Sequence, residues 1–216
     1  DRGYERNVEG NPEYSFAFKM NGVGIDAEVT DVEWNISKHG QIIPKVRFNP
    51  IKIGGIKVER ATGFHGKYIY DNRIGIGTKI KVIRSGDVIP YISEVVESSP
   101  HPKMPDLEYI WNESKVNLLV KNKEDNTELE LKKLVSFFRN INIENMNVGI
   151  IKKLFDHGYN SINKILNITI ENLLELPGVK QTLAEKLFNS IHKVIDDPID
   201  IPTIMTASLI FGHGFG

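Results

Sequence analysis

The sequence has 216 residues, of which 40 % are hydrophobic and 25 % are charged. This composition is typical of globular domains and argues against a mainly disordered chain. No stretch approaches the roughly 20 uninterrupted apolar residues of a membrane span, and the first residues, Asp1–Glu5, lack the apolar core of a signal peptide. We therefore expect a soluble intracellular protein without a membrane partner. The absence of cysteine excludes disulfides, thiolate catalysis and cysteine-based zinc or iron–sulfur sites.

The formal net charge of -1 conceals an uneven distribution of charge along the chain. The window from Lys38 to Val96 contains 11 Lys and Arg against 4 Asp and Glu, a net of +7, whereas the remainder contains 16 against 24, a net of -8. Clustered cations can neutralise phosphates and release counterions. The window is therefore either a polyanion-binding face or a solvated surface that happens to be basic, and charge alone does not decide between them.

The first half of the chain carries short β-rich runs separated by glycine turns. The expected strands are Ala27–Ile36, Ile42–Phe48, Ile51–Val58, Lys79–Ile83 and Tyr91–Val96, and the turn residues are Gly40, Gly54, Gly55, Gly75, Gly77 and Gly86. About five strands without a long helix fit a small closed barrel better than a sandwich, and the OB-fold is the first choice.

The pattern changes after Val96. Ser98–Pro105 is rich in proline and predicts a linker. Tyr109–Trp111 and Val116–Val120 predict one weak hairpin around Asn112–Ser114, and a charged stretch follows up to Glu130.

From Leu131 onward the apolar residues recur at helical spacing, which predicts an all-helical C-terminal part. The apolar faces are Leu131, Leu134 and Phe138; Ile150, Leu154, Ile165 and Leu166; and Leu183, Leu187 and Ile191, the last helix ending before Asp196.

Three short segments rich in Gly or Asn join these helices: Glu144–Val148, Leu176–Lys180 and Gly212–Gly216. Gly and Asn tolerate positive φ, and such junctions are typical of helix-hairpin-helix repeats. In these repeats the N–H groups at the start of the second helix can hold a DNA phosphate without reading a base. The alternative is a helical bundle with ordinary turns.

Along most of its length the sequence resembles the NAD-dependent DNA ligases. The matching segments follow the order and spacing of that family's OB domain: Asp31–Trp34, Lys38–Gly40, Pro44, Asn49–Pro50, Gly54–Gly55, Ala61–Thr62, Ile76–Gly77 and Arg84–Pro90. The resemblance implies that Arg84, Val88 and Ile89 lie against the duplex near a nick. Arginine offers a planar donor fork to phosphate, and paired apolar side chains can press into the minor groove.

The resemblance also implies DNA contacts in the turn at Lys38 and His39. There the family has Arg-Thr-Gly and this chain has Lys38–His39–Gly40, which keeps a cation but loses bidentate geometry. Upstream, Tyr14–Met20 resembles the last motif of the family's nucleotidyltransferase domain, which implies that Lys19 contacts the adenylate phosphate. The family's Lys-x-Asp-Gly motif, which supplies the nucleophilic lysine, is absent from the sequence.

The chain departs from the family downstream of the barrel. The family's four-cysteine zinc finger is replaced by a cysteine-free stretch, so no zinc is expected and a divergent branch such as a viral enzyme is suggested. The hairpin residues that the resemblance assigns to DNA are Asn145, Asn147, Gly178, Lys180, Gly214 and Gly216.

The sequence thus predicts a multidomain chain, an all-β OB barrel followed by an all-α helix-hairpin-helix domain. The expected parts are residues 1–24, the tail of the adenylation domain; 25–99, the OB domain; 100–132, a linker or zinc-finger remnant; and 133–216, a truncated helical domain.

As implied by the resemblance, the full enzyme seals nicks through enzyme-adenylate and DNA-adenylate intermediates. It uses NAD, bound by domains outside this chain, and Mg. The chain alone is not expected to be active. The expected partner is nicked duplex DNA without sequence preference, the expected state is a monomer, and the expected location is the cytoplasm, at the nucleoid or a viral replication site. Alternatives are a non-enzymatic OB and hairpin module of repair or recombination, or another covalent nucleotidyltransferase, against which the helical repeats argue.

Overall fold

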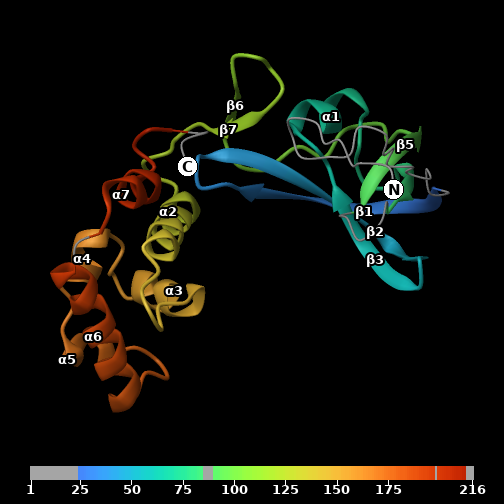
Figure 1. Ribbon diagram of the computed structural model, residues 1–216. Coiled ribbons are helices and arrows are strands. Elements are labelled where there is room, and N and C mark those ends of the chain that lie inside the picture. Colours follow the sequence, from blue (N-terminus) through green and yellow to red (C-terminus); the bar gives the residue numbers. More distant parts are fainter. Residues whose placement is uncertain (1–23, 85–89, 198, 213–216) are drawn as a thin grey trace, which may run out of the picture. The chain divides into compact units, whose positions relative to one another are not determined.

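The computed structural model describes residues 24–84, 90–197 and 199–212 (Figure 1). As far as it is described, the chain divides into two compact units. One holds residues within 1–32, 45–63 and 72–103, and the other holds residues within 33–44, 64–71 and 104–216. None of the helices in the described ranges is long and apolar enough to cross a membrane.

Five strands close into a barrel. They are β1 (Ile25–Ile36), β2 (Gln41–Ile53), β3 (Ile56–Thr62), β4 (Lys79–Ile83) and β5 (Tyr91–Glu97). The hydrogen-bonded order is β1-β4-β5-β3-β2, and β2 pairs back to β1, which closes the ring. The β3–β5 pairing is parallel, whereas β1–β4, β2–β3 and β4–β5 are antiparallel. A short helix, α1 (Gly66–Asp71), follows β3. This is the topology of a five-stranded OB-fold barrel, so the predicted fold of this part is confirmed.

The core of the barrel follows from alternation along its strands, because successive side chains of a strand point to opposite faces. On β4, Ile80 and Val82 are fully buried while Lys79 faces solvent. Thr78 is fully buried before the strand, where its hydroxyl oxygen accepts a hydrogen bond from the backbone N–H of Gly75 at 2.9 Å. The Lys and Arg side chains are thus displaced to the outer surface of the barrel.

Two of the predicted strands have wrong boundaries. Ile42–Phe48 and Ile51–Val58 were expected to be separate, but β2 runs without a break from Gln41 to Ile53, and the turn comes at Gly54–Gly55. Pro50 is accommodated because the register of β2 against β3 shifts between Arg47 and Ile51; a bulge is a place where a missing backbone N–H breaks no ladder bond. The third strand, Ile56–Thr62, was therefore missed in most of its length.

The proline-rich segment after β5 is held against the barrel. Ser99 is buried, and both its backbone N–H and its hydroxyl donate to the Arg73 carbonyl oxygen, at 3.1 and 2.7 Å. The Lys103 N–H donates to the Ile74 carbonyl oxygen at 2.9 Å. A Cβ on Gly75 would lie 2.5 Å from the His101 carbonyl oxygen. This close approach requires glycine at position 75.

The predicted hairpin after the barrel is confirmed as β6 (Tyr109–Trp111) and β7 (Leu118–Val120). The helical part consists of α2 (Thr127–Asn140), α3 (Val148–Asp156), α4 (Ile162–Leu166), α5 (Ile170–Leu174), α6 (Gln181–Asp196) and α7 (Ile201–Ser208). The first of these helices begins four residues before the expected Leu131, because the side chain of Asn126 caps it by accepting from the Leu129 N–H. Helix α6 includes Asp196, one residue beyond the predicted end.

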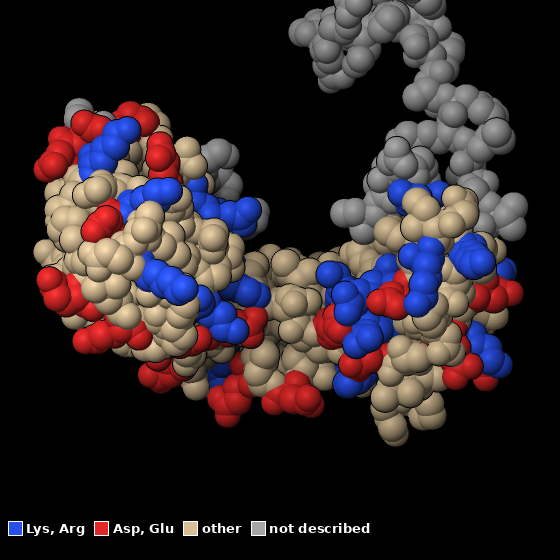
Figure 2. All heavy atoms as spheres, turned by 90° about the horizontal axis from the view of Figure 1, so that it is seen from below, with Lys and Arg blue, Asp and Glu red and all other residues tan. Residues whose placement is uncertain are grey.

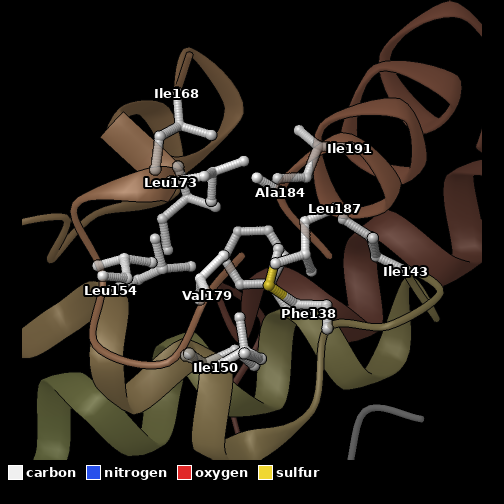
Figure 3. Packing of buried hydrophobic residues seen from close by; sticks show 14 of the residues in the cluster. Phe138, Ile143, Ile150, Leu154, Ile168, Leu173, Val179, Ala184, Leu187 and Ile191 are labelled. Carbon is white, nitrogen blue, oxygen red and sulfur yellow. The ribbon is translucent and has the colours of Figure 1, made fainter. Parts of the chain in front are cut away.

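One apolar core holds the helical part together. Figure 3 shows Phe138 with side chains of other helices and junctions pointing toward it, including Val179 and Leu187. Of the apolar positions expected from helical spacing, Leu134, Phe138, Ile150, Leu154, Ile165, Leu187 and Ile191 are buried in this core, and Leu131, Leu166 and Leu183 pack against it. The predicted helical character is confirmed, whereas its interpretation as helix-hairpin-helix repeats stays a prediction.

Candidate nucleic-acid interface

The turn between β1 and β2 carries the first predicted contact. The Ser37 N–H donates to the Gln41 carbonyl oxygen at 2.8 Å, and the Gln41 N–H donates to the Ser37 hydroxyl oxygen at 3.1 Å. These bonds fix the ends of the turn while Lys38 and His39 remain half-exposed between them. Lys38 forms no ion pair with any described residue. Its ammonium group can therefore take a phosphate without first giving up a carboxylate.

Gly40 anchors this turn. It has φ +81°, a conformation that L side chains rarely adopt, and its carbonyl oxygen accepts a hydrogen bond from the Val120 N–H at 2.9 Å. A Cβ at Gly40 would lie 3.1 Å from Cε of Lys123. The turn is thus hydrogen-bonded to the end of β7, and this bond stabilises the conformation of the turn.

Arg84 lies in the loop between β4 and β5. The residue follows Ile83, the last residue of β4, and Pro90 precedes β5. Ile83 pairs with Tyr91, and the Thr62 N–H donates to the Pro90 carbonyl oxygen at 3.2 Å, so both ends of the loop are fixed to the sheet. Arg84 is half-exposed. The predicted contacts Val88 and Ile89 lie outside the described residues.

The loops that carry Lys38 and Arg84 are the β1–β2 and β4–β5 loops of the barrel. OB-folds bind oligonucleotides through these two loops, so the predicted contacts occupy positions suited to nucleic acid. Figure 2 shows Lys and Arg side chains on the barrel, interspersed with Asp and Glu, on the side seen from below, and further Lys and Arg side chains on the helical part.

The cysteine-free stretch forms an apolar and hydrogen-bonded substructure. Strand β7 pairs with β2 at Gln41 and Ile42, and Leu118 is fully buried. A Cβ on Gly66 would lie 2.5 Å from Cγ of Leu118, so α1 begins in direct contact with this side chain. At the tip, the Asn112 Oδ1 accepts from the N–H groups of Val116 and Asn117, both at 3.0 Å. Within the described ranges no cluster of His, Asp and Glu could hold a metal ion.

The junction between α2 and α3 contains the first pair of predicted hairpin contacts. Asn145 adopts φ +64°, the positive φ that was expected of Asn at such a junction. Asn147 does not: it has φ -85° and caps α3 by accepting from the Ile150 N–H at 3.1 Å. The expectation of positive φ at Asn147 is therefore wrong, because this residue serves as N-cap. Its side chain accepts the hydrogen bond of a helix N–H group that could otherwise bind an anion.

The junction between α5 and α6 differs from the first. Gly178 has φ +76°. Lys180 stands at the N-cap of α6, is exposed, and makes no capping hydrogen bond from its side chain. The Lys153 Nζ donates to the Pro177 carbonyl oxygen at 2.7 Å, a contact that sequence reasoning missed because the two residues lie 24 positions apart. The N–H groups of Gln181 and Thr182, the first two of α6, thus have no acceptor among the described residues and lie beside a cation, whereas the Leu183 N–H donates to the Lys180 carbonyl oxygen at 2.9 Å.

Two other sets of predicted contacts lie outside the described residues. These are Lys19, assigned to the adenylate phosphate, and Gly214 with Gly216, assigned to the third hairpin. Gly212, which has φ +81° and follows helix α7 (Ile201–Ser208), is the described part of the third segment.

Comparisons with known proteins agree with the fold of the barrel. A family model described as the NAD-dependent DNA ligase OB-fold domain matches residues 26–103. The chain is 44 % identical over 211 residues to a DNA ligase of Acanthamoeba polyphaga mimivirus, which covers 98 % of this chain and 33 % of the relative. It is 36 % identical over 200 residues to a protein with a provisional DNA ligase name from invertebrate iridescent virus 6, covering 91 % of this chain and 31 % of that relative.

A further relative with a provisional DNA ligase name comes from invertebrate iridescent virus 3. It is 32 % identical over 209 residues, which are 95 % of this chain and 27 % of the relative. The chain therefore spans about a third of the length of the curated relatives it matches. Residues 26–103 thus match the OB-fold domain of NAD-dependent DNA ligases, and the chain on both sides of that domain is similar to viral DNA ligases.

Proposed function

We propose that this chain is the DNA-binding part of an NAD-dependent DNA ligase that seals nicks in duplex DNA. The observation that carries the proposal is the position of Lys38 and Arg84, in the β1–β2 and β4–β5 loops of a barrel that matches the family's OB domain. Both loops are fixed at their ends by backbone hydrogen bonds. A cation next to a fixed strand end binds a phosphate at a smaller cost in conformational entropy.

The barrel's contribution to the proposed reaction is positioning. Lys38 and Arg84 bind backbone phosphates and so hold the duplex in register, which turns the encounter of the DNA ends with the catalytic groups into an intramolecular event. Phosphate contacts carry no sequence information. We therefore propose binding without sequence preference and with steep dependence on salt.

We propose that the helical part is a second DNA-binding surface. Gly178 and Lys180 provide an open helix start and an adjacent exposed cation, which together suit a phosphate. Asn145 and Asn147 are proposed as a weaker contact, because the Asn147 side chain already occupies the Ile150 N–H. The same role is proposed for Gly214 and Gly216, which lie outside the described residues.

The chemical groups of the reaction are proposed to lie mainly in other domains of the longer enzyme, where NAD and Mg would bind. Lys19 is the proposed exception, as a contact of the adenylate phosphate. The sequence contains no Lys-x-Asp-Gly motif, and so the chain by itself should bind nicked DNA without sealing it. We propose that it acts as a monomer in the compartment where DNA is replicated or repaired.

The proposal is tested by binding of the chain to labelled duplexes of the same sequence, one nicked and one intact. We expect binding to nicked DNA and a loss of about tenfold on Arg84→Ala, because a charge-assisted contact contributes about 1.5–3 kcal/mol before losses to solvent. Arg139→Ala removes one exposed guanidinium from the last turn of α2 and serves as control. Failure of the chain to bind either duplex, or equal affinities of the two variants, would contradict the proposal.

The alternative of a non-enzymatic repair module is separated by a second assay. The longer polypeptide that contains this chain is mixed with NAD, Mg and nicked duplex, and sealing is followed on a denaturing gel. NAD-dependent sealing supports the ligase, whereas tight DNA binding without any protein adenylylation supports the non-enzymatic module.

A further inference from the structure

The hairpin formed by β2 and β3 ends in an open, tight turn. Gly54 and Gly55 have φ +58° and +81°, the pair of positive angles that a two-residue hairpin loop of type I′ requires. Apart from the glycine and its two chain neighbours, no described residue has an atom within 4 Å of a Cβ built on Gly54 or Gly55. The tip is therefore free of packing partners among the described residues and can be approached closely by a large ligand.

Cations face one another across this hairpin. Lys52 on β2 is paired with Lys57 on β3, and Arg47 is paired with Arg60 in the same ladder. The two strands carry five cations, including Lys45, against a single acid, Glu59. Directly opposite residues of an antiparallel pair lie close enough for like charges to repel and destabilise the sheet. Lys52 and Lys57 are exposed, and neither forms an ion pair with a described residue.

The opposite arrangement holds across β4 and β5. Lys79 is paired with Glu97 and Lys81 with Glu94, with ion-pair distances of 2.6 and 2.8 Å. The hydrogen bonds that Lys79 and Lys81 donate to these glutamates raise the pKa of both lysines above its usual value. The same barrel thus pairs Lys79 and Lys81 with carboxylates and leaves Lys52 and Lys57 without an ion pair to a described residue. The ammonium groups of Lys52 and Lys57 repel each other at the exposed tip, and an anion that binds there would reduce this repulsion.

We propose that Lys52 and Lys57 bind phosphates of the duplex DNA backbone, as a contact separate from the loops that carry Lys38 and Arg84. This rests on the proposed function, because it takes duplex DNA as the polyanion. Two flexible ammonium groups beside a tip with no side-chain bulk can follow the backbone without reading bases. Binding relieves the mutual repulsion of the two lysines, since each gains a negative partner.

The test compares two double variants that each remove two positive charges. Lys52→Gln with Lys57→Gln removes the unbalanced pair, and Lys79→Gln with Lys81→Gln removes the balanced pair as a matched control. For each protein the affinity for nicked duplex is measured over a range of salt concentrations. We expect the slope of log K against log salt to become shallower by about 2 for the first variant, because each phosphate contact contributes about 0.9. The control should keep the slope of the unmodified chain.

Three results distinguish the possibilities. An unchanged slope for Lys52→Gln with Lys57→Gln, in a chain whose unmodified form binds DNA, overturns this inference and leaves the proposed function standing. Equal losses of slope in both double variants also overturn it, because the effect then comes from net charge. If the unmodified chain does not bind DNA, the proposed function itself fails.

Folding of the variants is checked by thermal melting. Removal of like charges should leave the melting temperature equal or higher, and a fall for the first double variant overturns the argument from repulsion. Lys52→Arg with Lys57→Arg keeps both charges and should retain the salt slope.

Discussion

The Nζ of Lys153 on α3 donates a hydrogen bond to the carbonyl oxygen of Pro177 at 2.7 Å, immediately before Gly178 in the turn that leads to α6. Residues far apart in sequence thus meet at one junction. The Gly178 Cβ position lies 3.5 Å from the same Nζ. Lys153 therefore positions the backbone that begins α6, the helix whose first N–H groups we propose to face a phosphate.

We predict that Lys153→Met weakens both the junction and DNA binding. The loss of one hydrogen bond should lower the free energy of unfolding by about 1 kcal/mol, and affinity for nicked duplex should fall because the turn at Gly178 is no longer held. Lys152→Met, on the exposed neighbour in α3, is the control and removes the same charge. Chemical denaturation and DNA titration measure the two effects, and equal behaviour of the two variants would exclude a positioning role.

Asn147 and Lys180 should show opposite effects on stability and binding. Asn147→Ala removes the cap of α3, which costs about 1 kcal/mol, and should change DNA affinity little. Lys180→Ala removes no capping bond, so stability should stay the same while affinity for DNA falls. The measurements are urea unfolding and fluorescence anisotropy. A fall in DNA affinity for Asn147→Ala that equals the fall for Lys180→Ala would contradict the distinction between the two junctions.

The β6–β7 hairpin should be stable without metal. Its tip depends on Asn112, whose Oδ1 accepts from two backbone N–H groups, so Asn112→Ala should lower the free energy of unfolding by about 1–2 kcal/mol. Glu113→Ala, on the exposed neighbouring residue, serves as control. Treatment with EDTA should leave the melting temperature unchanged, and a drop on chelation would show that a metal contributes to the fold.

Asp31 should make stability dependent on pH in the acid range. Its carboxylate accepts a hydrogen bond from Lys103, and this bond lowers the pKa of Asp31 below its usual value. A lowered folded-state pKa means that the contribution is present above the unfolded pKa, about 4, and is lost as the pH falls through the folded value. Unfolding measured between about pH 6 and 2 should therefore show a steeper loss for the unmodified chain than for Asp31→Asn. Asp26→Asn, on the exposed neighbouring stretch of β1, should follow the unmodified chain.

The sequence predicted much of the barrel because strand signals are local. Alternating apolar residues and glycine turns were enough to predict the OB-fold and to place Lys79–Ile83 correctly. The boundary between β2 and β3 was wrong because a β-rich run, Ile51–Val58, continues across Gly54–Gly55. Composition alone cannot show that the chain reverses within such a run.

The features that sequence reasoning missed depend on register or on tertiary contact. That Lys52 lies opposite Lys57 follows from the β2–β3 pairing, which no single-strand pattern reveals. The bond between Lys153 and Pro177 joins separate helices and has no local signal. The capping role of Asn147 was the exception, because Asn is a preferred N-cap residue and its place just before an apolar helical run could have predicted it.

The most direct test of the central claim measures adenylylation and DNA binding separately in the longer polypeptide that contains this chain. Lys38→Ala with Arg84→Ala is compared with the unmodified protein in two steady-state assays, transfer of the adenylyl group from NAD to the protein and sealing of nicked duplex. We predict unchanged adenylylation and a KM for nicked DNA that is at least about tenfold higher, as expected when charged contacts of about 1.4 kcal/mol or more are lost. Unchanged sealing, or an equal loss of activity in the adenylylation and sealing assays, would contradict the claim that this chain binds the DNA substrate.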